Sequence, residues 1–296
     1  MTSMSLTQPR SGRSRERVLT VHAIGKHFGA VKALTDVDFW VNEGEVVALI
    51  GDNGAGKSTL VKLLSGVYSP DAGLIEYDGE PVEIHSPADA QELGIATVFQ
   101  DLALCDNLDV VANLWLGREL RTGRTLDEVD MEQQTWTLLR ELSAKIPSVR
   151  TPVASLSGGQ RQTVAIARSL IGDPRIVILD EPTAALGVAQ TAEVLNLIER
   201  LRERGHGVVL VSHSMADVMA VADRVVVLRL GRNNGVYNIA DVTSETLIAA
   251  ITGATDNAVA RRASERATPD AAEGKIFRMR DLNARRDQKP RGGGPS

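Results

Sequence analysis

Hydrophobic and polar residues alternate along two early stretches of the chain, Val18–Ile24 and Val37–Val41. A period of two is typical of a β-strand with one buried face. The next hydrophobic run, Glu45–Ile50, lacks this alternation and indicates a strand that is covered on both faces. An Asp-Gly pair inside the alternating stretch Ile75–Ile84 predicts a β-hairpin. The first part of the chain is therefore expected to combine antiparallel strands with a buried parallel strand.

The spacing becomes helical between Leu108 and Leu142, where hydrophobic residues recur three and four positions apart. Beyond this stretch, strand and helix patterns alternate. Strands are predicted over 95–99, 176–179, 208–212 and 225–230, and helices over 161–171, 189–204 and 215–222. Such alternation predicts an α/β fold with a parallel sheet, because parallel neighbours need long crossover connections. Residues 101–171 are expected to form a helical subdomain within it.

A glycine-rich loop, Gly51–Thr59, follows the buried strand and precedes a predicted helix. Its pattern, GxxxxGK[ST] between a strand and a helix, is typical of a phosphate-binding loop. Glycines let backbone N–H groups point inward, and a helix N-terminus adds partial positive charge. Lys57 is expected to reach the β- and γ-phosphates of a nucleotide, and Ser58 to bind Mg²⁺. The predicted nucleotide-binding residues of the loop are Gly51, Asp52, Asn53, Gly54, Ala55, Gly56, Lys57, Ser58 and Thr59. A plain glycine turn with a Ser/Thr helix cap is the structural alternative.

Two acids, Asp180 and Glu181, directly follow the predicted strand Ile176–Leu179 and look like a Walker B segment. Asp180 would hold Mg²⁺ through water, and Glu181 would polarise the water that attacks the γ-phosphate. Gln100 and His213 also end predicted strands, where a doubly wound sheet places its ligand. Gln100 could orient the metal or the water, and His213 could donate a hydrogen bond to the γ-phosphate. An isolated acid pair at a strand end would instead be read as solvated turn residues.

A second phosphate-binding device is predicted within Leu156–Gln160, where a serine and two glycines open a helix. Its residues are Ser157, Gly158, Gly159 and Gln160. One ATP does not need two such devices from one chain. The sequence therefore predicts a head-to-tail dimer, in which this stretch closes on the glycine-rich loop of the other subunit. Phe28, upstream of the loop, is a candidate platform for the base, with an ordinary core or strand-end phenylalanine as the alternative.

Composition, net charge and cysteine count exclude several classes of protein. The chain has 296 residues, 43% of them hydrophobic, and a net charge of −5, which argues against a dominant nucleic-acid surface. The lone Cys105 excludes an intrachain disulfide and is expected to be a packing residue. No hydrophobic run reaches the ~20 residues that span a bilayer, so a membrane role is expected to depend on a partner.

The two ends of the chain are predicted to be tails. Residues 1–17 are expected to form a disordered basic tail, and residues 254–296 a polar, partly disordered one. The segment Ile276–Leu282 alternates like the first strand. It could be the remnant of a second copy of the domain, a docking strand or plain tail.

Taken in order, the loop, Gln100, Leu156–Gln160, Ile176–Glu181 and His213 resemble the nucleotide-binding subunit of an ABC transporter. The resemblance covers about residues 18–253. It implies a P-loop NTPase fold of the ABC ATPase type: a parallel sheet core, an antiparallel β subdomain and a helical subdomain. It also implies ATP and Mg²⁺ as cofactors and ATP-driven closure of a dimer that moves a pair of membrane permease subunits. In that family setting, Phe28 stacks on adenine and the region after Gln100 meets the permease.

Finer features are similar to carbohydrate importers of the ribose/xylose/fructose type: Asn107–Val110, Leu116–Glu119 and Glu181–Gly187. This implies a cytoplasmic subunit, peripheral on the inner face of the membrane, in a system with a separate solute-binding protein. Two features depart from the pattern. Gly187 stands where many ABC proteins carry an Asp, and a single domain implies a homodimer or a sister subunit. The competing hypotheses are an ABC ATPase of a non-sugar transporter and a soluble ABC protein acting on the ribosome or DNA.

Overall fold

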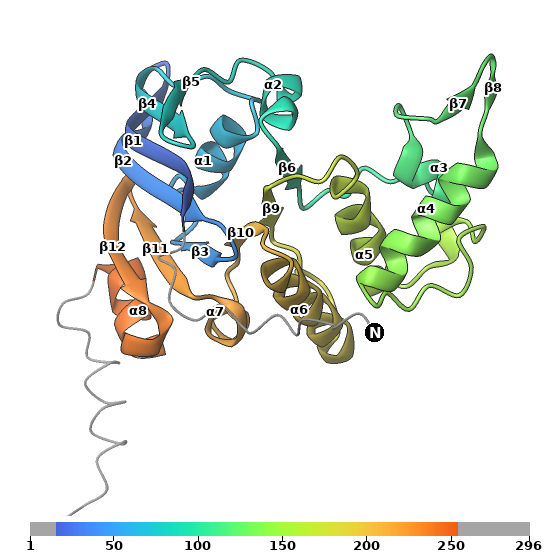
Figure 1. Cartoon of the computed structure of the whole chain (residues 1–296). Helices are drawn as coiled ribbons and strands as arrows, with labels where there is room; N and C mark the ends of the chain where they lie inside the picture. Colours follow the sequence, from blue (N-terminus) through green and yellow to red (C-terminus); the bar gives the residue numbers. More distant parts are fainter. Residues whose placement is uncertain (1–15, 254–296) are drawn as a thin grey trace, which may run out of the picture. The chain divides into compact units, whose positions relative to one another are not determined.

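The computed structural model of this chain describes residues 16–253 (Figure 1). The alternating segment Ile276–Leu282, the C-terminal tail and most of the N-terminal tail lie outside them. Strand β1 begins at Arg17, one residue inside the expected N-terminal tail. Arg17 belongs to the strand because it pairs with Asn42 of the neighbouring strand and its guanidinium lies 5.1 Å from the centre of the Trp40 ring.

An antiparallel sheet has the strand order β2-β1-β4-β5. The strands are β1 (Arg17–Phe28), β2 (Val31–Asn42), β4 (Ala72–Tyr77) and β5 (Glu80–Val82). The predicted hairpin is confirmed, with Tyr77 opposite Glu80 and both Asp78 and Gly79 at positive φ. The second strand of the hairpin is shorter than the expected run to Ile84.

The central sheet has six strands in the order β12-β11-β3-β10-β9-β6. Its parallel strands are β3 (Val46–Ile50), β6 (Ile95–Val98), β9 (Ile176–Asp180), β10 (Gly207–Val211) and β11 (Arg224–Arg229). The parallel core of the α/β fold is thus confirmed. An unpredicted edge strand, β12 (Arg232–Asn238), runs antiparallel to β11. Its sequence, RNNGVYN, carries too few hydrophobic residues to stand out from a loop.

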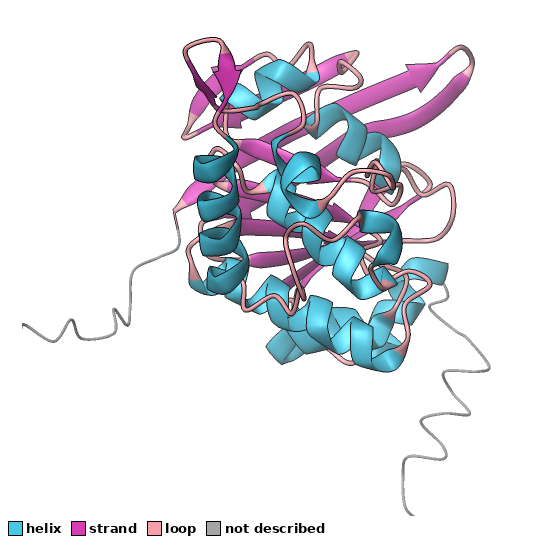
Figure 2. Cartoon of the chain, turned by 90° about the vertical axis from the view of Figure 1, so that its right-hand side faces the viewer, coloured by secondary structure: helices cyan, strands magenta, loops and turns pink. Residues whose placement is uncertain are grey.

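Both faces of the central sheet are buried, which explains the unbroken hydrophobic runs of its strands. In β3, Val46, Ala48 and Ile50 belong to one hydrophobic cluster, which also contains side chains of α3–α8. Val47 and Leu49 belong to the other, together with α1 and the antiparallel sheet. Alternate residues point to opposite faces of a sheet, so each strand supplies both cores. Figure 2 shows the helices (cyan) in front of the strands (magenta).

The helices are α1 (Lys57–Leu64), α2 (Pro87–Glu92), α3 (Val110–Trp115), α4 (Glu128–Glu141), α5 (Gly158–Ser169), α6 (Val188–Glu203), α7 (Met215–Val221) and α8 (Ser244–Thr252). Single turns of 3₁₀ helix, η1 (Val153–Ser155) and η2 (Ile239–Asp241), complete the set among residues 16–253. Helices α3, α4 and α5 lie next to one another (Figure 1, green to yellow). The expected helical stretch 108–142 is interrupted by a small hairpin, β7 (Arg121–Thr122) and β8 (Thr125–Leu126). The hairpin turns at Gly123, whose φ is +66°.

Candidate active site

Neighbouring parallel strands carry the candidate residues to one edge of the central sheet. Strand β10 lies between β3 and β9, with Val211 paired to both Leu49 and Asp180. Strand β6 flanks β9, with Val98 opposite Leu179. The carboxyl ends of these four strands lead into the glycine-rich loop, His213, the acid pair and Gln100. Residues from four distant parts of the sequence therefore converge, as expected for a ligand site in an open α/β sheet.

These residues line one cavity of about 480 Å³. Its lining consists of Phe28, Val31, Lys32, Ala33, Asn53, Gly54, Ala55, Gly56, Lys57, Ser58, Thr59, Gln100, Asp180, Glu181, Val211 and His213. Gly51 and Asp52 of the loop do not line it, and neither do Ser157, Gly158, Gly159 and Gln160. The structure therefore gathers most of the candidate residues in one place and leaves the second glycine motif elsewhere on the chain.

Helix α1 begins without a side-chain cap, at Gly56 with φ of +105°. A Cβ atom at Gly56 would lie 2.6 Å from Leu34 Cδ2 and 2.9 Å from Ala33 O, so backbone conformation and space both require glycine. The alternative of a Ser/Thr-capped helix is therefore wrong. The first N–H groups of α1 have no intrahelical acceptor, and Lys57, Ser58 and Thr59 of its first turn line the cavity. Such a helix start suits an anion.

Lys57 is buried, and its Nζ donates hydrogen bonds to the carbonyl oxygens of Gly51 (2.8 Å) and Asp52 (3.1 Å). The backbone carbonyl groups of Gly51 and Asp52 thus hold the lysine ammonium in place. Burial lowers the pKa of Lys57, and the carboxylates of Glu181, Asp180 and Asp52 oppose that shift. A cation held between carbonyl groups and acids at a helix N-terminus fits a phosphate group.

Both acids of the pair are partly buried. Burial raises the pKa of Asp180, opposed by Lys57, Lys62 and His213, and it raises the pKa of Glu181, opposed chiefly by His213. Glu181 has φ of +54°, in the left-handed region that non-glycine residues adopt at a cost of about 1–2 kcal/mol. This conformation turns the chain away at the end of β9.

His213 Nε2 lies 3.1 Å from Glu181 Oε1, within ion-pair distance. The contact lacks the alignment of a hydrogen bond, so this buried oxygen has no hydrogen-bond partner among residues 16–253. A buried carboxylate oxygen without a donor is unusual and fits a bound water or hydroxyl.

The residues present fit a nucleotide with its metal. No cluster of three or more metal-ligating His, Cys, Asp or Glu side chains occurs in the described part of the chain. A cation here would therefore rest on Asp180, Ser58 and Gln100, completed by phosphate oxygens and water. Magnesium, which keeps much of its hydration, suits such a sparse set of protein ligands.

Phe28 ends β1 and is 43% exposed, so it is not a core residue. Tyr68 meets it edge-on, with ring centroids 5.1 Å apart, and Lys26 Nζ lies 5.6 Å from its ring. Sequence reasoning missed Tyr68 and the cavity residues Val31, Lys32 and Ala33. Proximity to Phe28 in the hairpin could have indicated the latter three. Nothing in the sequence links Tyr68 to Phe28.

Ser157 is the N-cap of α5. Its Oγ accepts a hydrogen bond from Gln160 N (3.3 Å), and Ser157 N donates to Gln160 Oε1 (2.9 Å), a reciprocal capping box. The serine is exposed, and its O–H remains able to donate. A Cβ at Gly159 would lie 3.0 Å from Gln190 Cβ, so α6 packs directly on the start of α5.

Gly187 is the N-cap of α6, at φ −74°. No atom lies within 4 Å of a Cβ built there, so the backbone and its surroundings would accept an aspartate. The departure from the family pattern at this position is therefore not forced by packing within the described chain.

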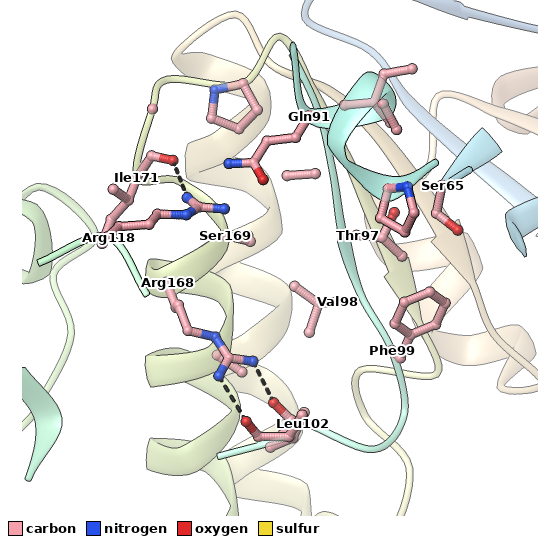
Figure 3. Close-up of a pocket in the computed structure, with 18 of the residues that line it drawn as sticks. Ser65, Gln91, Thr97, Val98, Phe99, Leu102, Arg118, Arg168, Ser169 and Ile171 are labelled. Carbon is pink, nitrogen blue, oxygen red and sulfur yellow. Dashed lines mark hydrogen bonds between the residues drawn. The ribbon is translucent and has the colours of Figure 1, made fainter. Parts of the chain in front are cut away.

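A second cavity of about 420 Å³ lies against the same strand end as the first (Figure 3). Its walls come from α2, β6, the segment 99–103 without Gln100, the second half of α5, and the residues Ser65, Val67, Leu114, Leu116, Arg118, Ile171, Gly172 and Pro174. Phe99 and Asp101–Ala103 face this cavity, whereas Gln100 lines the first. One short segment thus separates the two cavities.

Known proteins resemble this chain closely. The family model described as ABC transporter matches residues 34–184. The fructose import ATP-binding protein FrcA of Rhizobium meliloti is 45% identical over 249 residues, 81% of this chain and 96% of the relative. The xylose/arabinose import ATP-binding protein XylG of Sulfolobus acidocaldarius is 44% identical over 73% of this chain and 86% of the relative. The chain spans about half (47%) of the ribose import ATP-binding protein RbsA 2 of Rhizobium etli, at 41% identity over 80% of this chain.

Solved structures agree with these sequence matches. The protein cbiO1 from Clostridium perfringens, part of an ABC transporter complex, superposes with a TM-score of 0.69 at 26% identity, covering 84% of this chain and 99% of its own. The ADP conformation of an ATP-binding cassette of an ABC transporter superposes with a TM-score of 0.69 at 25% identity, covering 80% and 95%. Among residues 16–253, no helix combines the length and hydropathy that a bilayer crossing needs. The motifs, the fold and these matches together show that the chain belongs to the ABC transporter family, as an ATPase cassette of that family.

Proposed function

We propose that this chain is the ATP-hydrolysing subunit of an importer for a sugar or a similar small solute. One observation carries the proposal: the glycine-rich loop, Lys57, the acid pair, Gln100 and His213 line a single cavity. The naming of the relatives as fructose, xylose/arabinose and ribose import ATP-binding proteins supports the choice of solute. Residues 18–253 form the proposed ATPase domain, with 101–171 as its helical subdomain.

Each candidate residue has a proposed role in the reaction. The N–H groups of 53–59 and the ammonium of Lys57 bind the β- and γ-phosphates, Gly51 and Asp52 hold that ammonium through their carbonyl groups, and Phe28 stacks on the base. Ser58, Gln100 and Asp180 would hold Mg²⁺, which would supply positive charge to the phosphate groups.

Glu181 is the proposed residue that polarises the attacking water. Its oxygen without a hydrogen-bond partner is suitably free to accept a proton from that water. His213, beside this carboxylate, donates to the γ-phosphate.

A second subunit completes the site in this proposal. The second glycine motif binds the γ-phosphate of the ATP that the partner subunit holds. Its residues, Ser157, Gly158, Gly159 and Gln160, do not line the cavity of their own chain. The exposed Ser157 at the start of α5 is accessible to such a partner. The partner is a second copy of this chain or a sister subunit.

The second cavity is the proposed docking surface for a membrane permease. Leu116 and Val67, which line it, are 49% and 45% exposed, so the cavity offers hydrophobic side chains that a partner could cover. Because the segment 99–103 lies between the cavities, a permease seated there would sense the state of Gln100. Docking would hold the subunit on the cytoplasmic side of the membrane, and a solute-binding protein would meet the permease, not this chain.

The proposed hydrolysis of ATP is tested with two variants of the full chain. Lys57→Ala is expected to abolish nucleotide binding or hydrolysis, because it removes the buried ammonium. Glu181→Gln is expected to keep ATP binding, lose about 10²–10⁴-fold in turnover and accumulate an ATP-bound dimer. Unchanged hydrolysis in either variant would reject that residue's role.

The proposed role in transport is tested by co-purification from native membranes in mild detergent, followed by mass spectrometry. A polytopic permease and a solute-binding protein are the expected partners. A ribosome or nucleic acid that stays bound at physiological salt would overturn the transport assignment and leave the ATPase chemistry intact.

A further inference from the structure

Arg168, in the last turn of α5, holds the segment that follows Gln100. Its NH2 donates to the carbonyl oxygen of Leu102 (2.6 Å) and its NH1 to that of Ala103 (2.8 Å) (Figure 3). Both bonds cross more than sixty positions of sequence. The planar guanidinium suits two neighbouring acceptors, which a lysine ammonium could not span with the same geometry.

Within residues 16–253, no carboxylate contributes to the charge environment of this arginine. Burial lowers the pKa of Arg168, and the charged or ionisable groups that act on it are Cys105 and Arg118, with no acid among them. Placing a cation at a partly buried site without a counter-ion is unfavourable unless its hydrogen bonds compensate. Its two carbonyl contacts are thus the main polar interactions that the side chain makes within residues 16–253.

The backbone at the contact is shaped to meet the arginine. Successive carbonyl groups of an extended strand point to opposite sides, so one side chain cannot normally reach two in a row. Ala103 has φ of +48°, a left-handed conformation for a non-glycine residue. Its N–H donates to Asp101 Oδ1 (3.1 Å), which helps to hold this turn.

Arg168 also lies on the helix that begins with the second glycine motif. Ser157 caps α5 at its other end, eleven residues earlier, or about 16 Å along a helix. A rotation of α5 would therefore move Ser157 and, through Arg168, the segment attached to Gln100.

We propose that Arg168 is a positioning residue, which fixes Gln100 in the nucleotide cavity by tying residues 102 and 103 to helix α5. This inference rests on the proposed role of Gln100 in hydrolysis. It makes the placement of Gln100 in one subunit depend on the orientation of the helix that presents Ser157 to the other.

The test is a double-mutant cycle on ATP hydrolysis by the full chain, with Arg168→Met, Gln100→Ala and the double variant. Arg168→Met is expected to lower kcat about tenfold or more, with the KM for ATP nearly unchanged, because a small displacement of an orienting group affects turnover more than binding. In the Gln100→Ala background, the same change is expected to cause no further loss. Losses that multiply in the double variant, or a wild-type kcat for Arg168→Met, would overturn the proposal.

Two further variants separate the loss of this contact from misfolding and from the loss of an arginine elsewhere. Arg168→Lys retains the charge and the aliphatic stem and is expected to recover part of kcat; it replaces Arg168→Met if that variant does not fold. Arg204→Met is the control for loss of a helix-end arginine, since Arg204 pairs with Glu141 (2.8 Å) and lines neither cavity. It is expected to keep the wild-type rate.

Hydrogen exchange separates this proposal from the function on which it rests. In Arg168→Met, the amides of 101–104 are expected to exchange faster while those of α1 do not change; unchanged exchange in 101–104 would contradict the contact. If Gln100→Ala hydrolyses ATP at the wild-type rate, the role of Gln100 fails and the positioning role fails with it. If Gln100→Ala is slow and Arg168→Met is not, only the positioning role fails.

Discussion

At the level of single residues, burial sets the charge balance of the nucleotide cavity. It raises the pKa of Asp180 and Glu181 and lowers the pKa of Lys57, while the opposite charges of these groups counteract each shift. Burial therefore outweighs the opposing charges among residues 16–253 and disfavours the charged forms of these groups. Such sites gain most from a ligand that brings phosphate and metal charge.

The raised pKa of Glu181 predicts a pH-dependent stability. Between the ordinary value of 4.5 and the raised one, the folded state binds more protons than the unfolded state, so this residue destabilises the fold as pH rises through that window. Without nucleotide, Glu181→Gln is expected to have a Tm a few degrees above wild type near pH 8. The gap should shrink as the pH falls toward 4.5 and close below it, where the wild type is protonated in both states.

Thermal unfolding by circular dichroism across that pH range measures the gap. Glu92→Gln, an exposed glutamate on α2, is the matched control. A Tm difference for Glu181→Gln that does not change with pH would contradict the prediction.

Phe28 offers a separate test at the same scale. If its exposed ring stacks on the base, Phe28→Ala should weaken ATP binding by about 1–3 kcal/mol, roughly 5- to 150-fold, and Phe28→Tyr should restore it. Titration with a fluorescent ATP analogue gives both affinities. Leu74→Ala removes another exposed hydrophobic side chain of the same sheet, 40% exposed on β4, and should bind like wild type. Equal affinities for Phe28→Ala and this control would reject stacking.

At the level of elements, a single side chain organises the connection between the Gln100 segment and α3. Asn113 is completely buried on α3. Its Oδ1 accepts from Cys105 N (2.7 Å), and its Nδ2 is within 3.0–3.2 Å of the carbonyl oxygens of Cys105, Leu108 and Asp109. The three carbonyl groups also accept backbone N–H groups, whereas the N–H of Cys105 has Asn113 Oδ1 as its acceptor, so this N–H depends on the side chain.

Asn113→Ala is therefore expected to lower the free energy of unfolding by about 3 kcal/mol, since it removes the four hydrogen bonds of a buried amide and leaves the N–H of Cys105 without its acceptor. Urea denaturation of the full chain measures the loss. Gln134→Ala on α4, where the amide makes an exposed contact to Asp130 (3.0 Å), is the control and should change stability by less than about 0.5 kcal/mol. A similar loss in both variants would show that the buried network does not hold the loop.

At the level of the whole molecule, the separation of the two glycine motifs bears on how subunits assemble. The Gly51–Thr59 loop lines the cavity, whereas Ser157 caps a helix outside that lining. If the Ser157–Gln160 motif binds phosphate as proposed, a single chain carries halves of two different sites, which favours a two-subunit assembly with two composite sites. In a two-fold dimer each motif of one subunit would meet the other motif of its partner, so the contact occurs twice and the assembly is closed.

Ser157→Arg is expected to leave ATP binding by the monomer intact and to block dimer closure, because a long cation replaces a small hydroxyl at the contact. In a Glu181→Gln background with ATP, size-exclusion chromatography should give a monomer for Ser157→Arg. Ser157→Thr, which keeps the hydroxyl and the helix cap, should still dimerise. A normal dimer from Ser157→Arg would defeat the head-to-tail arrangement.

Some strands could be predicted from the sequence and others could not, for physical reasons. Parallel strands such as Ile176–Leu179 were recognisable because burial on both faces leaves only hydrophobic residues there. Strand β12 was not recognisable, since an edge strand pairs through its backbone and its polar side chains carry no such pattern. The hairpin around Gly123 was missed for the same reason.

The sequence by itself determined the local chemistry: a loop that only glycine can build at Gly56, a lysine and hydroxyl beside it, and acids at the end of a buried strand. These follow from neighbouring residues, whose conformation and spacing are set along the chain. Only the tertiary structure decided which distant groups meet. Strand order placed β10 between β3 and β9 and so brought His213 to Glu181, and the packing of α5 brought Arg168 to the segment after Gln100. Contacts between residues far apart in sequence depend on how sheets and helices pack, which no local pattern records.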